Sequence, residues 1–313
     1  MEQPTRIFLW CWPRTISTAL EKCMSFVDGM QTWHEPYTVA YGTNVMTNLA
    51  MSSEQNAISH TVLRYFEMMA ETDENSHLAG GNLMSTPLFT YSFVKDKLEE
   101  YEPGKKYIFI KDMASAIAGH YDDLPDKQVP TRHTFLIRHP YRFLTSQRRL
   151  LLRLGEYKGD PRDFDMLSAS PLISESYFRE DWMYQLWKYV QDTGKDPNPV
   201  VIDAEDLMNN PEVILPEYMA ALGIPFQKRY LTWDASEDSL KDWKGALEHM
   251  LIGKEVGLFD RAFKSSRFLP SLHPTPSKQD LTPDILKVAD VILPGYEAMF
   301  CHRIRPIKLQ ARL

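Results

Sequence analysis

The sequence predicts an α/β fold in which a mostly parallel central sheet of about five strands is flanked by helices. Two observations carry this prediction: short apolar runs bounded by turn residues, and helical patterns that alternate with them along the chain. The sequence also lacks internal repeats and long low-complexity tracts. The 313 residues suffice for one large domain, and we expect a single domain over residues 1–313.

Four apolar runs have the length and composition of buried strands. Each is rich in β-branched or aromatic residues. They are RIFLWCW (Arg6–Trp12), KYIFIKD (Lys106–Asp112), HTFLIR (His133–Arg138) and PVVIDA (Pro199–Ala204). A fifth and weaker run is QTWHE (Gln31–Glu35). Because helical patterns separate these runs, we expect strand-helix units on a parallel sheet.

Helices are expected between the strands, and several carry start signals. Pro211 follows two asparagines and Pro283 follows Thr282, so both prolines suit a first helical turn. The expected helices are Ser17–Val27, Ala57–Glu71, Leu88–Glu99, Tyr141–Leu154, Tyr177–Asp192, Pro211–Leu222 and Pro283–Met299. The segment Ser236–Ser277 mixes short helical patterns with proline and serine, and we interpret it as a lid or a substrate or cofactor segment.

Composition excludes several classes of function. Hydrophobic residues make up 43% of the chain and the net charge is −7, so we expect a packed globular protein whose main partner is not nucleic acid. No apolar run is long enough to span a bilayer, and the first residues lack a signal-peptide pattern, which predicts a cytoplasmic protein without a membrane partner. The chain has three cysteines, an odd number, and their spacing fits neither a metal site nor a disulfide framework.

The loop PRTIST after the first expected strand has the chemistry of an anion site. Such a site needs backbone N–H groups at a helix N-terminus together with a cation and hydroxyl groups. Pro13 fixes the turn, and Arg14 supplies charge and a fork of donors. The residues that we expect to bind the anion are Pro13, Arg14, Thr15, Ile16, Ser17, Thr18 and Ala19.

The alternative for this loop is an ordinary helix start. Ser17 would cap the helix, Glu21 would be a first-turn carboxylate, and Arg14 would be solvated. The nucleotide-hydrolase pattern G-x-x-x-x-G-K-[ST] is absent, because the loop contains neither glycine nor lysine. A straightforward ATPase or GTPase is therefore not expected.

A second element, FLIRHPYRFLTSQRR, places another arginine at a strand end. Arg138 lies at the carboxyl end of an expected strand, where open α/β sheets bind ligands. Ser146 follows eight residues later, about one and a half turns into the next helix. Arg138 and Ser146 would then hold one phosphate between them. The alternative is a salt-bridged arginine and a surface serine.

These two elements resemble the donor-binding motifs of sulfotransferases that use 3′-phosphoadenosine-5′-phosphosulfate (PAPS). PRTISTALEK is similar to the family's 5′-phosphosulfate loop, in the branch that reads Pro-Arg-x-x-Ser-Thr-Ala-Leu, and the Arg138–Ser146 spacing resembles the 3′-phosphate motif. YIFIKDM and VVIDAEDLMNNPEVILPEYMAALGIPF resemble two further family segments, so the likeness spans residues 6–226. It implies a P-loop-like sulfotransferase fold, PAPS as sulfate donor, adenosine 3′,5′-bisphosphate as product, and no metal.

Sulfuryl transfer also needs a cation at the leaving phosphate and a base for the acceptor's proton. Arg14 and Lys111 are the candidate cations. When IKDM is aligned with the family's Lys-Thr-His strand, Met113 stands where the cytosolic branch has its histidine. Other branches have a glutamate after the second strand, and by likeness to them we select Glu35 as the base. Burial near aromatic rings would help by raising the pKa of Glu35. His34 and Asp112 remain rival bases.

The acceptor end of the site is less defined by the sequence. The likeness implies a late basic segment on the 3′-phosphate, for which Lys244, Lys264 and Arg267 are candidates. Five aromatic residues either line an acceptor pocket or belong to the core. They are Trp10, Trp12, Trp33, Tyr37 and Tyr41. We expect a small-molecule acceptor, with a hydroxyl favoured over an amine.

The rival functions are a nucleotide or small-molecule kinase and a family member that binds the donor product without catalysis.

Overall fold

Within the residues that the structure describes, the central sheet has seven parallel strands, which confirms the predicted fold class and exceeds the expected number of strands. The computed structural model describes residues 3–51, 82–154, 157, 159–168, 178–236, 241–271 and 274–306. The strand order is β3-β7-β2-β4-β1-β5-β6. The strands are β1 (Thr5–Cys11), β2 (Met30–His34), β3 (Leu83–Met84), β4 (Tyr107–Met113), β5 (Thr131–Ile137), β6 (Val200–Asp203) and β7 (Trp243–Ala246).

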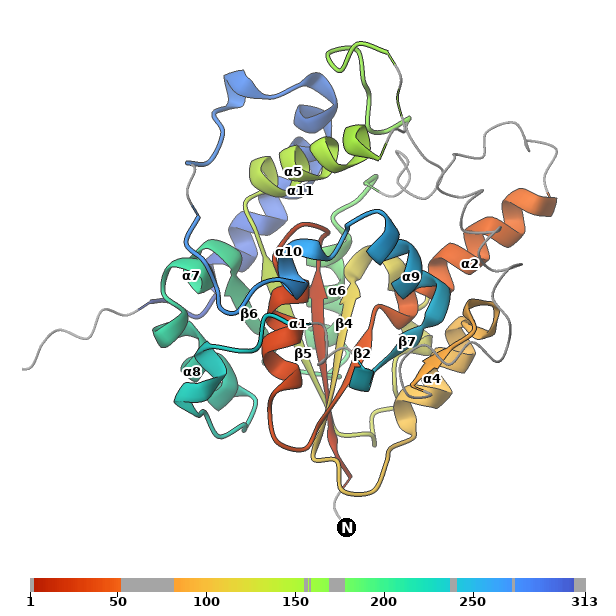
Figure 1. The fold of residues 1–313 in the computed structure, drawn as a ribbon, viewed down its shortest axis with the longest axis vertical. Helices are drawn as coiled ribbons and strands as arrows, with labels where there is room; N and C mark the ends of the chain where they lie inside the picture. The colour runs from red at the N-terminus through yellow and green to blue at the C-terminus, as the bar shows by residue number, and fades with distance from the viewer. Residues whose placement is uncertain are drawn as a thin grey trace, which may run out of the picture.

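Helices cover both faces of the sheet (Figure 1). Helix α1 (Ser17–Ser25) lies on one face with α10 (Asp260–Phe263) against it, while α6 (Trp182–Asp192) lies on the other face, against β5. The remaining α-helices are α2 (Pro36–Met51), α4 (Tyr91–Glu99), α5 (Pro140–Arg153), α7 (Ala204–Asn209), α8 (Pro211–Ala221), α9 (Leu247–Glu255) and α11 (Pro283–Cys301). Short 3₁₀ turns occur at Thr86–Leu88, Ala114–Ile117, Tyr121–Asp123, Lys228–Leu231 and Lys278–Asp280.

Five of the strands coincide with the five predicted runs, because long apolar stretches can be buried only between two helical layers. Every residue of β1 after Thr5 is buried. The predicted helix Ala57–Glu71 lies outside the described residues, as does the first residue of the predicted helix Tyr177–Asp192. The other predicted helices are observed with shifts at their ends.

Strand β7 and helices α9 and α10 arise in the segment 236–277, which the sequence left ambiguous. The sequence WKGA of β7 carries no strand pattern. A Cβ atom at Gly245 would lie 3.1 Å from the backbone oxygen of His34, so glycine permits the close approach of β7 to β2. Part of the segment therefore belongs to the sheet, and closure of the rest over a ligand stays a prediction.

The order of the strands places a switch point between β1 and β5. The chain leaves β1 towards β2 on one side, whereas it leaves β5 towards β6 on the other side. Ligands of open α/β sheets bind at the carboxyl ends of the strands at such a point. The loop that contains Arg14 follows β1, and Arg138 follows β5, so both predicted donor elements lie there.

The aromatic side chains that the sequence offered as a pocket wall are mostly core. Trp10, Trp12, Trp33 and Tyr37 are buried in the main hydrophobic cluster, and Tyr41 packs at its edge. All three cysteines are free thiols. Among the helices that the structure describes, none combines the length and the apolarity needed to cross a bilayer.

Candidate active site

The loop after β1 has an unusual backbone. Arg14 and Ile16 have φ values of 65° and 62°, in the left-handed region. A β-branched residue such as isoleucine rarely adopts this conformation, because its Cβ approaches the following carbonyl. Residues kept in this region cluster at ligand-binding sites. Left-handed residues also turn successive backbone N–H groups towards one side, which forms a concave anion site.

The N-terminus of α1 has no side-chain cap. Ile16, not Ser17, occupies the capping position and makes no side-chain hydrogen bond, so the ordinary helix start considered from the sequence is wrong. Among the described residues, the backbone N–H groups of Ile16, Ser17 and Thr18 have no hydrogen-bond partner. A helix end with unsatisfied N–H groups carries partial positive charge and binds anions.

Two hydroxyl groups of the loop are used within the protein. The Thr15 hydroxyl donates to the carbonyl oxygen of Trp12 at 2.7 Å, and the Thr15 side chain is buried. Ser17 is also buried and lies against the Cys11 thiol. These contacts close the loop onto β1. The contribution of Thr15 to an anion would therefore come from its backbone N–H and not from a free hydroxyl.

Arg14 lies among other arginines. Its Nε donates to Ser146 Oγ at 3.4 Å and its Nη1 to the Leu258 carbonyl oxygen at 3.4 Å. Among the described residues, no carboxylate pairs with Arg14. Burial, together with the positive charges of Arg153, Arg261 and Arg138, lowers the pKa of Arg14 to about 10. A bound anion would relieve this repulsion.

Arg138 joins the same cluster through the loop. Its Nη1 donates to the Arg14 carbonyl oxygen at 2.7 Å, and its Nε donates to Glu205 Oε1 at 3.0 Å. Glu205 also lies 3.4 Å from Arg142 Nε. The structure thus brings Arg14, Arg138 and Ser146 together, and it also shows the salt bridge that was the sequence-based alternative for Arg138.

The expected late basic residues have other partners or positions. Lys244 lies on β7 and pairs with Glu102 at 2.5 Å, and Lys264 pairs with Asp260 at 2.8 Å on the exposed side of α10. Arg267 is exposed. The charges of Arg153 and Arg261 act on Arg14 together with that of Arg138, and neither of these two residues was predicted from the sequence. Arg153 follows Ser146 by two helical turns, a spacing that places both on one face of α5.

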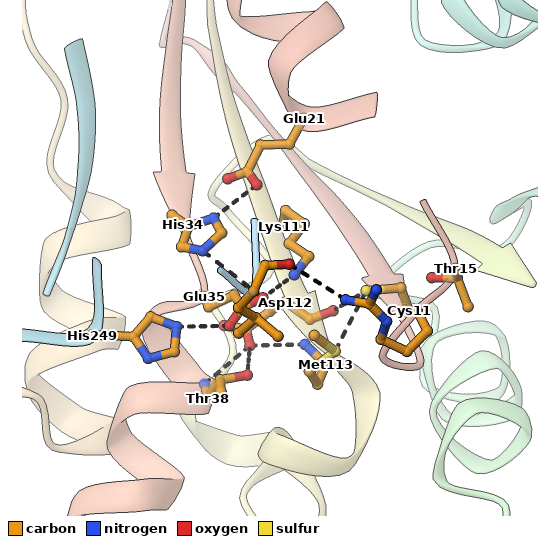
Figure 2. Close-up of polar contacts among 12 residues, drawn as sticks. Cys11, Thr15, Glu21, His34, Glu35, Thr38, Lys111, Asp112, Met113 and His249 are labelled. Carbon is orange, nitrogen blue, oxygen red and sulfur yellow. Dashed lines mark hydrogen bonds and ion pairs between the residues drawn. The ribbon is translucent and has the colours of Figure 1, made fainter. Parts of the chain in front are cut away.

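Glu35 lies at the junction of β2 and α2, where the chain turns with a φ of 52° (Figure 2). Its N–H continues the sheet ladder by donating to the Lys111 carbonyl oxygen at 2.8 Å. The buried Glu35 carboxylate contacts the Lys111 ammonium through Oε1, and His249 Nε2 lies 2.8 Å from Oε2. Figure 2 shows these side chains converging from β2, β4 and α9.

The pKa of Glu35 differs from the sequence-based expectation. Burial by itself would raise this pKa, but the Lys111 ammonium and the hydrogen bond from His249 hold it well below its usual range. The expectation of a raised pKa is therefore wrong, because it considered the aromatic neighbours and not the buried cation. Burial by itself would lower the pKa of Lys111, but Glu35 raises it, so both groups are charged near neutral pH.

His34 is closer to Glu35 than neighbouring residues of a strand would be. Its Nε2 lies 3.9 Å from Glu35 Oε1, because Glu35 leaves the extended conformation. Its Nδ1 lies 2.8 Å from Glu21 Oε2, and its Nε2 has no hydrogen-bond partner within the described residues. Burial lowers the pKa of His34 to about 4, so the ring is neutral near pH 7.

Asp112, the third candidate base, is engaged at the start of α2. Its carboxylate accepts from the backbone N–H groups of Tyr37 at 2.6 Å and Thr38 at 3.0 Å. It also accepts from the Thr38 hydroxyl at 2.6 Å and the Met113 N–H at 2.8 Å. Burial raises the pKa of Asp112 to about 7, although these hydrogen bonds oppose the rise. Its contacts are those of a helix cap.

One group of side chains has the composition of a metal site. The ligand atoms of His34, Glu35 and His249 lie within 4.8 Å of one another. Lys111, however, already occupies one oxygen of the Glu35 carboxylate. A divalent cation at this position would meet the Lys111 ammonium at short range, which costs electrostatic free energy.

Comparison with solved structures finds two sulfotransferase domains. The sulfotransferase domain from the curacin biosynthetic pathway is 14% identical, with a TM-score of 0.44, and the match covers 93% of this chain and 98% of that domain. The sulfotransferase domain from the Synechococcus PCC 7002 olefin synthase is 17% identical, with a TM-score of 0.46, and the match covers 94% of this chain and 96% of that domain. No protein-family model matches the chain, and no curated protein matches it in sequence.

Proposed function

We propose that the protein is an enzyme that moves a sulfuryl group from PAPS to a hydroxyl of a small molecule. The observation that carries this proposal is the uncapped N-terminus of α1, whose N–H groups adjoin an arginine that has no carboxylate partner among the described residues. The sequence likeness to PAPS-dependent sulfotransferases supports the same donor. Transfer to an amine is the less favoured chemistry.

The donor would be held at both of its phosphates. The N–H groups of Ile16, Ser17 and Thr18, with the Arg14 guanidinium, would bind the 5′-phosphosulfate. Arg138 and Ser146 would bind the 3′-phosphate. Three N–H groups of Arg138 serve Glu205 and the Arg14 carbonyl oxygen, so the other two of its five are left for a ligand.

Transfer would occur beside the carboxylate and cations at the ends of β2 and β4. Arg14 and Lys111 would stabilise charge on the leaving phosphate, and the Glu35–His249 pair would take the acceptor's proton. The acceptor oxygen forms a bond to sulfur while the bond from sulfur to the 5′-phosphate oxygen breaks. The leaving group keeps that electron pair as adenosine 3′,5′-bisphosphate.

The test of the donor site is a thermal-shift titration with adenosine 3′,5′-bisphosphate, ATP and AMP. A ligand that binds only the folded state stabilises it by about 2.7 kcal/mol at 100 times its Kd. We expect a shift that is selective for the bisphosphate and is lost in Arg138→Ala. Arg132→Ala is the matched control, because Arg132 lies at the other end of β5 and pairs with Asp196 as Arg138 pairs with Glu205.

The outcomes distinguish the rival functions. A shift that favours ATP would support a kinase, and the absence of any shift would refute the donor site. Binding of the bisphosphate without transfer from PAPS to any hydroxyl or amine acceptor would indicate a non-catalytic binding protein. Equal loss in Arg132→Ala and Arg138→Ala would attribute the effect to stability and not to the site.

A further inference from the structure

The proton acceptor of the reaction is not settled by the position of Glu35 alone. Both oxygens of this carboxylate are engaged, Oε1 by Lys111 and Oε2 by His249. The Glu35 side chain is 4% exposed, whereas that of His249 is 18% exposed. An acceptor that approaches from solvent would therefore meet the imidazole more readily than the carboxylate.

The geometry fixes which nitrogen of His249 carries a proton. Glu35 is ionised near neutral pH, because the pKa of its carboxyl is held well below the usual range. A carboxylate accepts hydrogen bonds and cannot donate them, so Nε2, at 2.8 Å from Oε2, carries the proton of this contact. In the tautomer that this contact selects, Nδ1 carries the lone pair. Figure 2 shows this second nitrogen turned away from Glu35.

Titratable groups from three other parts of the chain surround the His249 ring or the cluster to which it belongs. His34 comes from the end of β2 and Glu35 follows it at the junction with α2, and the ring centroids of His34 and His249 are 5.7 Å apart. The charges of Lys111 from β4 and Glu21 from α1 act on the same cluster. Among the described residues, Nδ1 of His249 has no hydrogen-bond partner.

His34 is less suited to this role. Its ring packs between Trp243, at 5.5 Å between centroids, and the edge of Phe259, at 4.8 Å. Its Nδ1 is bound to Glu21, and the side chain is 1% exposed. The His34 ring is thus enclosed on the sides where an acceptor would have to enter.

We propose that His249 Nδ1 is the general base of the reaction and that Glu35 orients it. The inference rests on the proposed sulfuryl transfer. The proton of the acceptor hydroxyl passes to Nδ1 while the acceptor oxygen bonds to sulfur. Glu35 holds the Nε2–H and stabilises the imidazolium that forms, which is the division of labour between histidine and carboxylate in the serine-protease triad. Glu35 is then a positioning residue.

The kinetic test uses two acceptors that differ in acidity, benzyl alcohol and 4-nitrophenol, with PAPS as donor. His249→Gln should slow transfer to benzyl alcohol by about 10²–10⁴, the usual contribution of a general base. Transfer to 4-nitrophenol should fall much less, because this phenol ionises without help. Equal slowing of both acceptors, or no slowing of either, would overturn the proposal.

Two further measurements keep the result decisive. Nitrogen-15 spectra of histidine-labelled protein should show His249 as the Nε2–H tautomer, with the signal assigned by its loss in His249→Gln and with the exposed His302 as reference. An Nδ1–H tautomer would refute the proposal even if neither alcohol is accepted. The double variant Glu35→Gln/His249→Gln should be no slower than His249→Gln, because residues that act as a unit are not additive.

Failure of this inference is distinguishable from failure of the proposed function. His249→Gln should bind adenosine 3′,5′-bisphosphate as the native protein does, since His249 contacts Glu35 and not the α1 loop. Native binding together with undiminished transfer in His249→Gln would reject His249 as base and leave the function standing. Absence of bisphosphate binding in the unmodified protein would reject the function itself.

Discussion

The buried pair of Glu35 and Lys111 gives a sharp prediction for stability. The exposed fractions of the two side chains are 4% and 1%, so solvent screens their attraction very little. Glu35→Gln would leave the Lys111 ammonium buried without its carboxylate. Breaking a buried pair from one side costs about 3–5 kcal/mol, because an uncompensated charge remains in the interior. We expect this loss in the free energy of unfolding of Glu35→Gln.

Lys111→Met should cost less, because Glu35 keeps the hydrogen bond from His249 at 2.8 Å. The double variant Glu35→Gln/Lys111→Met removes both charges and should be more stable than Glu35→Gln alone, by about 2 kcal/mol, since replacing a whole buried pair is far cheaper than halving it. Urea unfolding at pH 7 measures all three. Asp260→Asn is the control, because the exposed pair of Asp260 with Lys264 should change stability by less than about 1 kcal/mol.

A free energy of unfolding for Glu35→Gln within about 1 kcal/mol of the native value would refute a stabilising buried pair. A double variant whose loss equals the sum of the two single losses would refute it as well. The pH dependence supplies a second check. The folded pKa of Glu35 lies below the ordinary value of 4.5, so its contribution is present above that pH and is lost as pH falls through the folded pKa. The stability difference between the native protein and Glu35→Gln should therefore shrink below pH 4.5. The Lys111 pKa is raised above 10.5, so Lys111 stays charged throughout this window.

Two other predictions concern the elements around the site. Asp112→Ala removes a carboxylate that accepts three hydrogen bonds from the start of α2 and one from the end of β4, and it should cost about 2–4 kcal/mol by urea unfolding. Asp112→Asn should cost clearly less, and equal effects of the two substitutions would contradict the role of Asp112 as a cap. Lys22→Met removes a buried ammonium that binds the carbonyl oxygens of Ser236 at 3.1 Å and Phe263 at 2.5 Å. It should cost about 1–3 kcal/mol and speed proteolytic cleavage within 241–265, and an unchanged cleavage rate would argue against this anchor.

The central part of the sheet was predictable because its signal is local. A run such as IFLWC in β1 cannot be exposed on either face, so length and apolarity alone identify it. The loop after β1 was predictable for a similar reason, since Pro13, Arg14 and the hydroxyl residues are contiguous. Helix α2 was harder to predict, because its sequence contains glycine, threonine and asparagine. Its start is also fixed by Asp112, which comes from β4 and is distant in sequence.

The sequence by itself determined the parallel α/β architecture and the placement of Arg14, Arg138 and Ser146 in one region, because each depends on neighbouring residues and a regular period. Only the tertiary structure decided the charge state of Glu35 and the identity of its partners. His249 lies 214 positions from Glu35 and reaches it through β7, a strand without a strand pattern. Electrostatic free energy depends on distance in space and on burial, and neither quantity can be read from separation along the chain.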